Sequence, residues 1–195
     1  MKNIVFDLGG VLFARDRNKS TQEFIDFFSF IRTEQMPRFW VEYDRGTSTL
    51  DETIATLCDL SGFSTEKCAA LVRQSIDMQM TVKSTEQLIV DLKGAGYRLY
   101  VLSNMSHEFI AFLRQFPVYA LFDGEVVSCE EGVVKPEPRI YQILLERYAL
   151  ASDETLFIDD RSANIVAAAN LGIHVQLFDP HHAVDSCQTL RKLLL

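Results

Sequence analysis

Residues 3–10, Asn-Ile-Val-Phe-Asp-Leu-Gly-Gly, decide how the rest of the chain is interpreted. The short, mainly apolar run over 3–6 ends at an acidic residue, Asp7, and the pair Gly9-Gly10 follows it. Such a run predicts a buried strand followed by a turn. A carboxylate at the end of a buried strand is costly unless it is exposed or binds a cation. Asp7 is therefore the first candidate for a functional residue.

The remainder of the sequence alternates strand-like and helical patterns. Apolar runs typical of buried strands recur at 98–103, 155–159 and 173–178. One of the helical patterns between them begins with Ser84 and Gln87, which predict a capping box, and is closed by Gly94 and Gly96. Strands that alternate with helices predict right-handed crossovers and a parallel sheet, with functional groups at the carboxyl ends of the strands.

One segment, from about residue 20 to residue 80, breaks this alternation. Aromatic and apolar residues recur there at helical spacing, as Phe24, Phe27 and Phe28 illustrate, and the pattern predicts a small helical bundle with an aromatic core. We therefore expect a core domain formed by 1–15 and 80–195 and a helical cap formed by 16–79. Gly46 marks a turn in the cap where a substrate-facing loop could lie, and the neighbouring Arg45 either contacts substrate or is solvated.

Composition narrows the class of protein. The net charge of −8 argues against binding to nucleic acid or to anionic membranes, because both are negatively charged and bind positively charged proteins more tightly. Four cysteines without a Cys-x-x-Cys pair predict reduced thiols in a cytoplasmic protein. We expect no secretory signal and no membrane span, because the chain runs directly into the first strand and no apolar run is long enough.

Four polar points fall at or just beyond the predicted strand ends. They are Asp7, Ser103-Asn104, Lys135 in Lys-Pro-Glu-Pro, and Asp159-Asp160. Each has a structural explanation when taken alone, since a strand-end Asp can form a turn or cap a helix and a lysine can be solvated. A parallel sheet brings its strand ends together, however, and the four points then form one site.

The chemistry of these side chains suits phosphoryl transfer. The carboxylate of Asp7 can attack phosphorus and form an acyl phosphate, which water then cleaves. The repulsion between a carboxylate and a phosphate must be neutralised, and Mg²⁺ held by acidic oxygens, including Asp159 or Asp160, achieves this. Lys135 adds a positive charge, and the Ser103-Asn104 pair offers donors for phosphoryl oxygens.

The ordered set resembles the four motifs of the haloacid dehalogenase-like superfamily. Val-Phe-Asp-Leu-Gly-Gly at 5–10 resembles motif one, Leu-Ser-Asn at 102–104 motif two, Lys-Pro-Glu-Pro at 135–138 motif three, and Phe-Ile-Asp-Asp-Arg-Ser-Ala-Asn at 157–164 motif four. The resemblance implies an α/β, Rossmannoid parallel sheet flanked by helices, and the insert resembles the helical cap that follows motif one in many members.

The same resemblance implies a role for each site residue. Asp7 would be the nucleophile, and Lys135 would balance its charge. Ser103, Asn104 and the glycine turn Gly9-Gly10 would contact phosphate. Magnesium would be held by Asp7, by the main-chain carbonyl of Gly9, and by Asp160 with or without Asp159.

The sequence departs from the family pattern at Gly9. Phosphatases of this superfamily usually carry a second Asp two residues after the nucleophile, which protonates the leaving group and then activates water. Asp16 and His107 are the candidate substitutes, and a surface role for Asp16 is equally compatible with the sequence.

The resemblance as a whole implies a Mg²⁺-dependent phosphatase for a small phosphorylated metabolite, with a sugar phosphate favoured. The pattern is most similar to a bacterial subgroup that includes a glucose-1-phosphate phosphatase, and more distantly to the phosphatase domain of soluble epoxide hydrolases. Two alternatives stay open. One is a binding or regulatory protein without turnover, and the other is a metal-independent dehalogenase, in which the same Asp attacks carbon.

Overall fold

The structure is a computed structural model of the 195-residue chain and describes residues 1–33 and 35–195. Its centre is a five-stranded parallel sheet in the order β5-β4-β1-β6-β7. The predicted α/β fold with a parallel sheet is confirmed. The strands are β1 (Asn3–Phe6), β4 (Arg98–Ser103), β5 (Gly124–Val127), β6 (Thr155–Asp159) and β7 (His174–Leu177).

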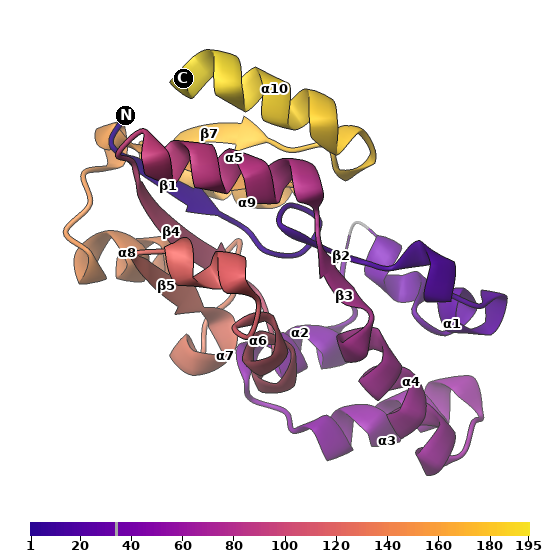
Figure 1. Cartoon of the computed structure of the whole chain (residues 1–195). Coiled ribbons are helices and arrows are strands. Elements are labelled where there is room, and N and C mark those ends of the chain that lie inside the picture. The colour runs from indigo at the N-terminus through magenta and orange to yellow at the C-terminus, as the bar shows by residue number, and fades with distance from the viewer. Residues whose placement is uncertain (34) are drawn as a thin grey trace.

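Helices cover both faces of this sheet because side chains alternate along each strand. Ile4 and Phe6 point into one hydrophobic core and Val5 into the other. The first core lies under α5 (Lys83–Gly94) and α10 (Ala183–Leu194), which run side by side over the sheet (Figure 1). The second core is closed by α8 (Pro138–Arg147) and α9 (Ser162–Ala169). The remaining core elements are α6 (His107–Leu113), η3 (Pro117–Leu121), α7 (Ser128–Glu131), η4 (Ser152–Glu154) and η5 (Pro180–His182).

Most predicted strand limits agree with the structure. The runs over 3–6, 98–103 and 155–159 are strands over these residues, and the run over 173–178 is a strand from His174 to Leu177. The capping box at Ser84 is wrong, because α5 already begins at Lys83 and its N-cap, Val82, makes no side-chain cap. The carboxylate of Glu86 instead accepts hydrogen bonds from Thr81 and Lys83.

The segment between β1 and α5 contains a helical insert. A two-stranded antiparallel ribbon, β2 (Phe13–Arg15) with β3 (Gln79–Thr81), connects it to the sheet domain. Between the two strands lie η1 (Arg17–Lys19), α1 (Gln22–Phe27), η2 (Ser29–Arg32), α2 (Arg38–Arg45), α3 (Leu50–Ser61) and α4 (Thr65–Asp77). All of these helices fall within 16–79, although the division into core and cap domains stays a prediction.

Aromatic packing holds the insert together and joins it to the sheet domain. The rings of Phe24, Phe28, Trp40 and Tyr43 are buried in one cluster, which confirms the predicted aromatic core for Phe24 and Phe28. Phe109 of α6 belongs to the same cluster, and its ring centroid lies 6.3 Å from that of Trp40. Helix α2 therefore packs against the sheet domain, where it lies beside α7 (Figure 1).

Two further sequence expectations concern the solution state of the chain. All four cysteines are free thiols. Among the described residues, no helix combines the length and apolar character needed to cross a membrane.

Candidate active site

Asp7 occupies the middle of the carboxyl edge of the sheet. It follows β1, which pairs with β4 on one side and β6 on the other, and its backbone amide donates to Ile158 O at 2.9 Å. The Ser103 hydroxyl donates to Asp7 Oδ1 at 2.8 Å, and the Leu8 amide donates to the same oxygen at 2.7 Å. Only 6% of Asp7 is exposed, so one carboxylate oxygen is held firmly at the bottom of the site.

The Lys135 ammonium reaches this carboxylate from the loop between α7 and α8. Its Nζ lies 2.9 Å from Asp7 Oδ1 and 2.6 Å from Asp159 Oδ2, and it donates to Leu102 O at 2.9 Å. Burial acts to lower the pKa of Lys135, but the ion pairs with the two aspartates outweigh it and raise this pKa. The ammonium therefore stays charged beside the candidate nucleophile.

Asn104 holds the backbone of the lysine loop. Its Nδ2 donates to Lys135 O at 2.9 Å, and its Oδ1 accepts from Lys135 N at 2.8 Å. The resemblance assigned this side chain to phosphate, whereas here both ends of the amide bind the lysine backbone. In this geometry Asn104 fixes where the ammonium lies.

The acidic pair after β6 divides into two different environments. Asp159 is fully buried and accepts from Lys135, from the Arg161 amide at 2.8 Å, and from Asn164 Nδ2 at 3.0 Å to each oxygen. Within the described residues, no hydrogen bond or ion pair engages the carboxylate of Asp160. Asp159 therefore orients the lysine, and Asp160 keeps its oxygens for a ligand.

The glycine turn makes room for Asp160. Gly10 has φ +77°, and a Cβ there would lie 2.4 Å from Asp160 Oδ2, so position 10 needs glycine for both its conformation and its size. Gly9 differs, because its φ is not positive and a Cβ there would meet only Met105 Cε, at 3.9 Å. The missing carboxylate at position 9 is thus not explained by lack of space.

The charges of the site call for a cation. Asp7, Asp159 and Asp160 can each place an oxygen within 4.8 Å of the others, and the positive charges of Lys135 and Arg161 act on this cluster. Burial, with the charge of Asp159, raises the pKa of Asp7, and burial with the charges of both neighbours raises the pKa of Asp160 to about 7. A hard divalent cation held by acidic oxygens fits this donor set and this excess of negative charge.

The two predicted substitutes for the missing acid lie elsewhere. Asp16 caps η1, accepts from the Asn18 amide at 3.0 Å and lies 3.6 Å from the Lys19 ammonium. His107 is exposed at the first turn of α6. In the part of the chain that the structure describes, no hydrogen bond or ion pair joins either residue to Asp7 or Lys135.

The helical insert contributes a residue that the sequence analysis missed. Asp44, in the last turn of α2, is largely buried, and the charges of Arg161, Asp7 and Lys135 act on its carboxyl group. Burial, together with the charge of Asp7, raises the pKa of Asp44 to about 7, against the opposing effect of Arg161. The turn at Gly46 marks this region in the sequence, where Arg45 and not Asp44 was the expected substrate contact.

Arg45 itself joins the helical insert to the rest of the chain. Its guanidinium donates to both carboxylate oxygens of Glu137, at 2.6 and 3.0 Å, and to Gly132 O at 3.3 Å. It is therefore neither fully solvated nor directed at the Asp7 carboxylate.

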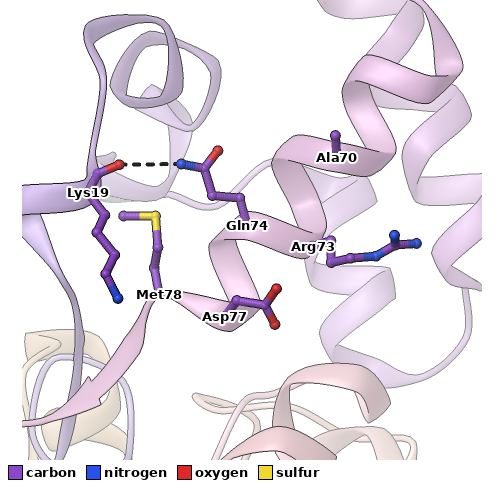
Figure 2. Close-up of a pocket in the computed structure, with 6 residues that line it drawn as sticks. All are labelled: Lys19, Ala70, Arg73, Gln74, Asp77 and Met78. Carbon is purple, nitrogen blue, oxygen red and sulfur yellow. Dashed lines mark hydrogen bonds between the residues drawn. The ribbon is translucent and has the colours of Figure 1, made fainter.

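A surface hollow of about 360 Å³ lies on another side of the insert. Figure 2 shows it between the η1 segment and α4, with Lys19 and Arg73 on opposite sides and Asp77 between them. Gln74 Nε2 donates across it to Lys19 O at 3.3 Å. None of its lining residues belongs to the constellation around Asp7, so this hollow is separate from the candidate active site.

Comparisons with known proteins identify the family of this chain. The family described as haloacid dehalogenase-like hydrolase matches residues 1–172. The chain is 30% identical to the sesquiterpene phosphatase astK of Aspergillus oryzae, over 99% of this chain and 96% of that protein. It is 28% identical to the D-ribitol-5-phosphate phosphatase of Bacteroides thetaiotaomicron, over 100% of this chain and 98% of that protein.

A solved structure shows the same architecture. It is a HAD family enzyme from Bacteroides thetaiotaomicron in complex with magnesium and inorganic phosphate. The match has a TM-score of 0.71 at 26% identity and covers 91% of this chain and 94% of the other. From the sequence match over most of its length and the motif residues gathered around Asp7, the chain belongs to the haloacid dehalogenase-like hydrolase family.

Proposed function

We propose that this protein is a Mg²⁺-dependent phosphatase that hydrolyses a small phosphorylated metabolite through an aspartyl-phosphate on Asp7. One observation carries the proposal. The Asp7 carboxylate lies between the Ser103 hydroxyl and the Lys135 ammonium, beside the acidic oxygens of Asp160. A nucleophile, positive charge and a cation site in one place are what phosphoryl transfer from an ester requires.

Each side chain around Asp7 has a separate role in the proposed reaction. Asp7 Oδ1 is held by Ser103 and Lys135, which leaves Oδ2 as the oxygen that attacks phosphorus. Asp159 and Asn104 position Lys135, so its charge opposes the repulsion between the carboxylate and the phosphate. Ser103 and the turn at Gly9-Gly10 border the space that the phosphoryl oxygens would occupy.

Magnesium is the proposed cofactor. Asp7 and Asp160 would hold it, with the carbonyl of Gly9, and when bound it would neutralise the charge of the phosphate. Support comes from the carboxylate of Asp160, which lies near Asp7 and has no hydrogen bond or ion pair among the described residues, and from the related enzyme that was crystallised with magnesium and phosphate.

The proposed substrate is a sugar or polyol phosphate. The charge of Arg161 acts on Asp44 of the cap close to Asp7 and Lys135, so charged groups are available near the nucleophile. Several large aromatic rings of the cap, among them Trp40 at 4% exposure, are buried in its own core, which leaves fewer of them to bind an apolar tail. This favours a hydroxylated leaving group, as in the ribitol phosphate relative and the glucose-1-phosphate phosphatase-like subgroup, over a terpenoid one.

The acidic residues of the site fit a dehalogenase less well than a phosphatase. Dehalogenases of the superfamily need no metal and usually lack the second acidic residue of motif four, whereas Asp160 is present here and has free oxygens. A regulatory protein without turnover would have no need for the contacts that hold Lys135 against Asp7.

The test is release of inorganic phosphate from ribitol 5-phosphate, glucose 1-phosphate, glucose 6-phosphate, farnesyl phosphate and p-nitrophenyl phosphate, with Mg²⁺ and with EDTA. We expect turnover only with Mg²⁺, none in Asp7→Asn, and a preference for the polar esters. Undiminished turnover in EDTA or in Asp7→Asn would overturn the mechanism. A preference for farnesyl phosphate would overturn the substrate class.

A further inference from the structure

We propose that Asp44 of the cap supplies the acid and base that the core lacks at position 9. The inference rests on the proposed phosphatase function and assigns it a proton donor. Asp44 lies in the last turn of α2, and no motif of the sheet domain includes it.

Contacts of the α2 backbone place Asp44 on the Gly9 side of the site. Ser128 Oγ donates to Asp44 O and accepts from Met105 N at 2.9 Å. The methyl group of Met105 is the nearest atom to the position that a Cβ on Gly9 would take. A short chain of contacts therefore leads from Asp44 to the place where related phosphatases carry their acid.

Neighbouring contacts fix the rotation of α2. The Tyr43 hydroxyl donates to Glu108 at 2.8 Å, and Arg45 pairs with Glu137 at 2.6 Å. Gly46, with φ +79°, packs against the backbone of Cys129, where a Cβ would lie only 2.4 Å from the carbonyl oxygen. With both neighbours anchored to the sheet domain, α2 holds Asp44 close enough to Asp7 and Lys135 for their charges to act on its carboxyl group.

The surroundings of Asp44 suit proton transfer. Burial and the charge of Asp7 favour its neutral form, while Arg161, Lys135 and the backbone of Ser106 favour the carboxylate. Its pKa, raised to about 7, allows both forms to take part near neutral pH. Arg161 is itself held to the cap, since it donates to Ile31 O at 3.3 Å.

The reaction has two steps, and Asp44 transfers a proton in each. As Asp7 Oδ2 attacks phosphorus, the bond from phosphorus to the ester oxygen breaks, and that oxygen takes the proton of Asp44 and leaves as an alcohol. The Asp44 carboxylate then takes a proton from water while the water oxygen attacks the aspartyl-phosphate. The bond from phosphorus to Asp7 breaks, inorganic phosphate leaves, and Asp44 is again protonated.

The experiment compares parent, Asp44→Asn and the control Asp59→Asn, which removes an exposed carboxylate from α3 of the same insert. Rapid-quench kinetics are measured with glucose 6-phosphate, whose leaving alkoxide needs a proton, and with p-nitrophenyl phosphate, whose leaving group does not. We expect Asp44→Asn to lose about 10²- to 10⁴-fold on glucose 6-phosphate. With p-nitrophenyl phosphate it should form aspartyl-phosphate at nearly the parental rate and accumulate it as a burst. Asp59→Asn should match the parent.

A rescue separates proton transfer from a structural role. A Cβ at position 9 would make only an ordinary contact with Met105 Cε, so the double variant Gly9→Asp/Asp44→Asn should recover about tenfold or more of the lost glucose 6-phosphate turnover. Equal losses on both substrates without rescue, or no loss, would overturn the role of Asp44. Inactivity of the parent, or undiminished turnover in Asp7→Asn, would instead refute the phosphatase itself. Circular dichroism and Mg²⁺-dependent thermal shifts establish that each variant is folded.

Discussion

Without its metal, the protein should become less stable as the pH rises through the range in which Asp160 ionises. The folded protein holds the pKa of Asp160 at about 7, against 3.8 as the ordinary value of the group. A pKa raised by folding gives stability that is fully present below the ordinary value and is lost as pH rises to the folded value. Asp7 and Asp44 have raised pKa values and act in the same direction.

The size of the effect follows from this shift. A difference of roughly 3 pKa units corresponds to about 4 kcal/mol at most, because each unit is worth about 1.36 kcal/mol. About 2–3 kcal/mol of this contribution to the free energy of unfolding should be lost between about pH 5 and about pH 7.5. Carboxylates with lowered pKa values, such as Glu86 and Glu137, lose their stabilising effect only as the pH falls below this range, so they do not mask it.

The assay is urea unfolding in EDTA, followed by the fluorescence of Trp40 and by circular dichroism at several pH values. Parent and Asp160→Asn are compared, because the amide keeps the shape of the side chain and cannot ionise. The variant should lack about 2 kcal/mol of the pH-dependent loss. Mg²⁺ should stabilise the parent more at high than at low pH, since its ligands must be deprotonated. Parallel curves for the two proteins, or a parent that becomes more stable over this range, would refute the reasoning.

Three further predictions concern single contacts. Lys135→Met should lower kcat about a hundred- to a thousandfold on p-nitrophenyl phosphate, and a value within twofold of the parent would place Lys135 outside the reaction. Gly10→Ala should weaken the Mg²⁺-dependent thermal shift, because its Cβ would meet Asp160 Oδ2 at 2.4 Å, and an unchanged shift would count against Asp160 as a ligand. Arg45→Ala and Glu137→Gln each remove the same ion pair, so each should raise KM by a similar factor. The double variant should raise KM little further, and additive effects of the two substitutions would contradict this.

Local signals explain why much of the fold was predictable. The strand over 3–6 is buried on both faces and ends in a glycine turn, so its limits appear in the sequence itself. Strand β5 was missed because its four residues include the partly buried Gly124 and Glu125 and carry no such pattern. Its position depends on pairing with β4, which is a tertiary contact.

The partners of the site residues were harder to predict than the residues themselves. Strand ends in a parallel sheet meet, so the sequence could place Asp7, Lys135 and the acidic pair in one site. It could not show that Asn104 binds the lysine backbone, or that Asp159 takes up the ammonium and leaves Asp160 free. Those roles depend on contacts of 2.6 to 2.9 Å between segments far apart in the chain.

The residue of the helical insert that faces the site could not be predicted from the sequence. Tyr-Asp-Arg-Gly at 43–46 marks a helix end, and the sequence alone gives no reason to prefer Asp44 over Arg45 as the residue that faces the site. Consecutive residues on a helix point about 100° apart, so only one of the two can do so. The docking of Gly46 against Cys129 fixes the rotation and sends Arg45 to Glu137. A carboxyl group in the cap can take part in proton transfer only while α2 is docked. If Asp44 is the acid, closure of the cap and completion of the catalytic site are therefore the same event, and weakening the Arg45–Glu137 pair should slow alkyl phosphates more than p-nitrophenyl phosphate.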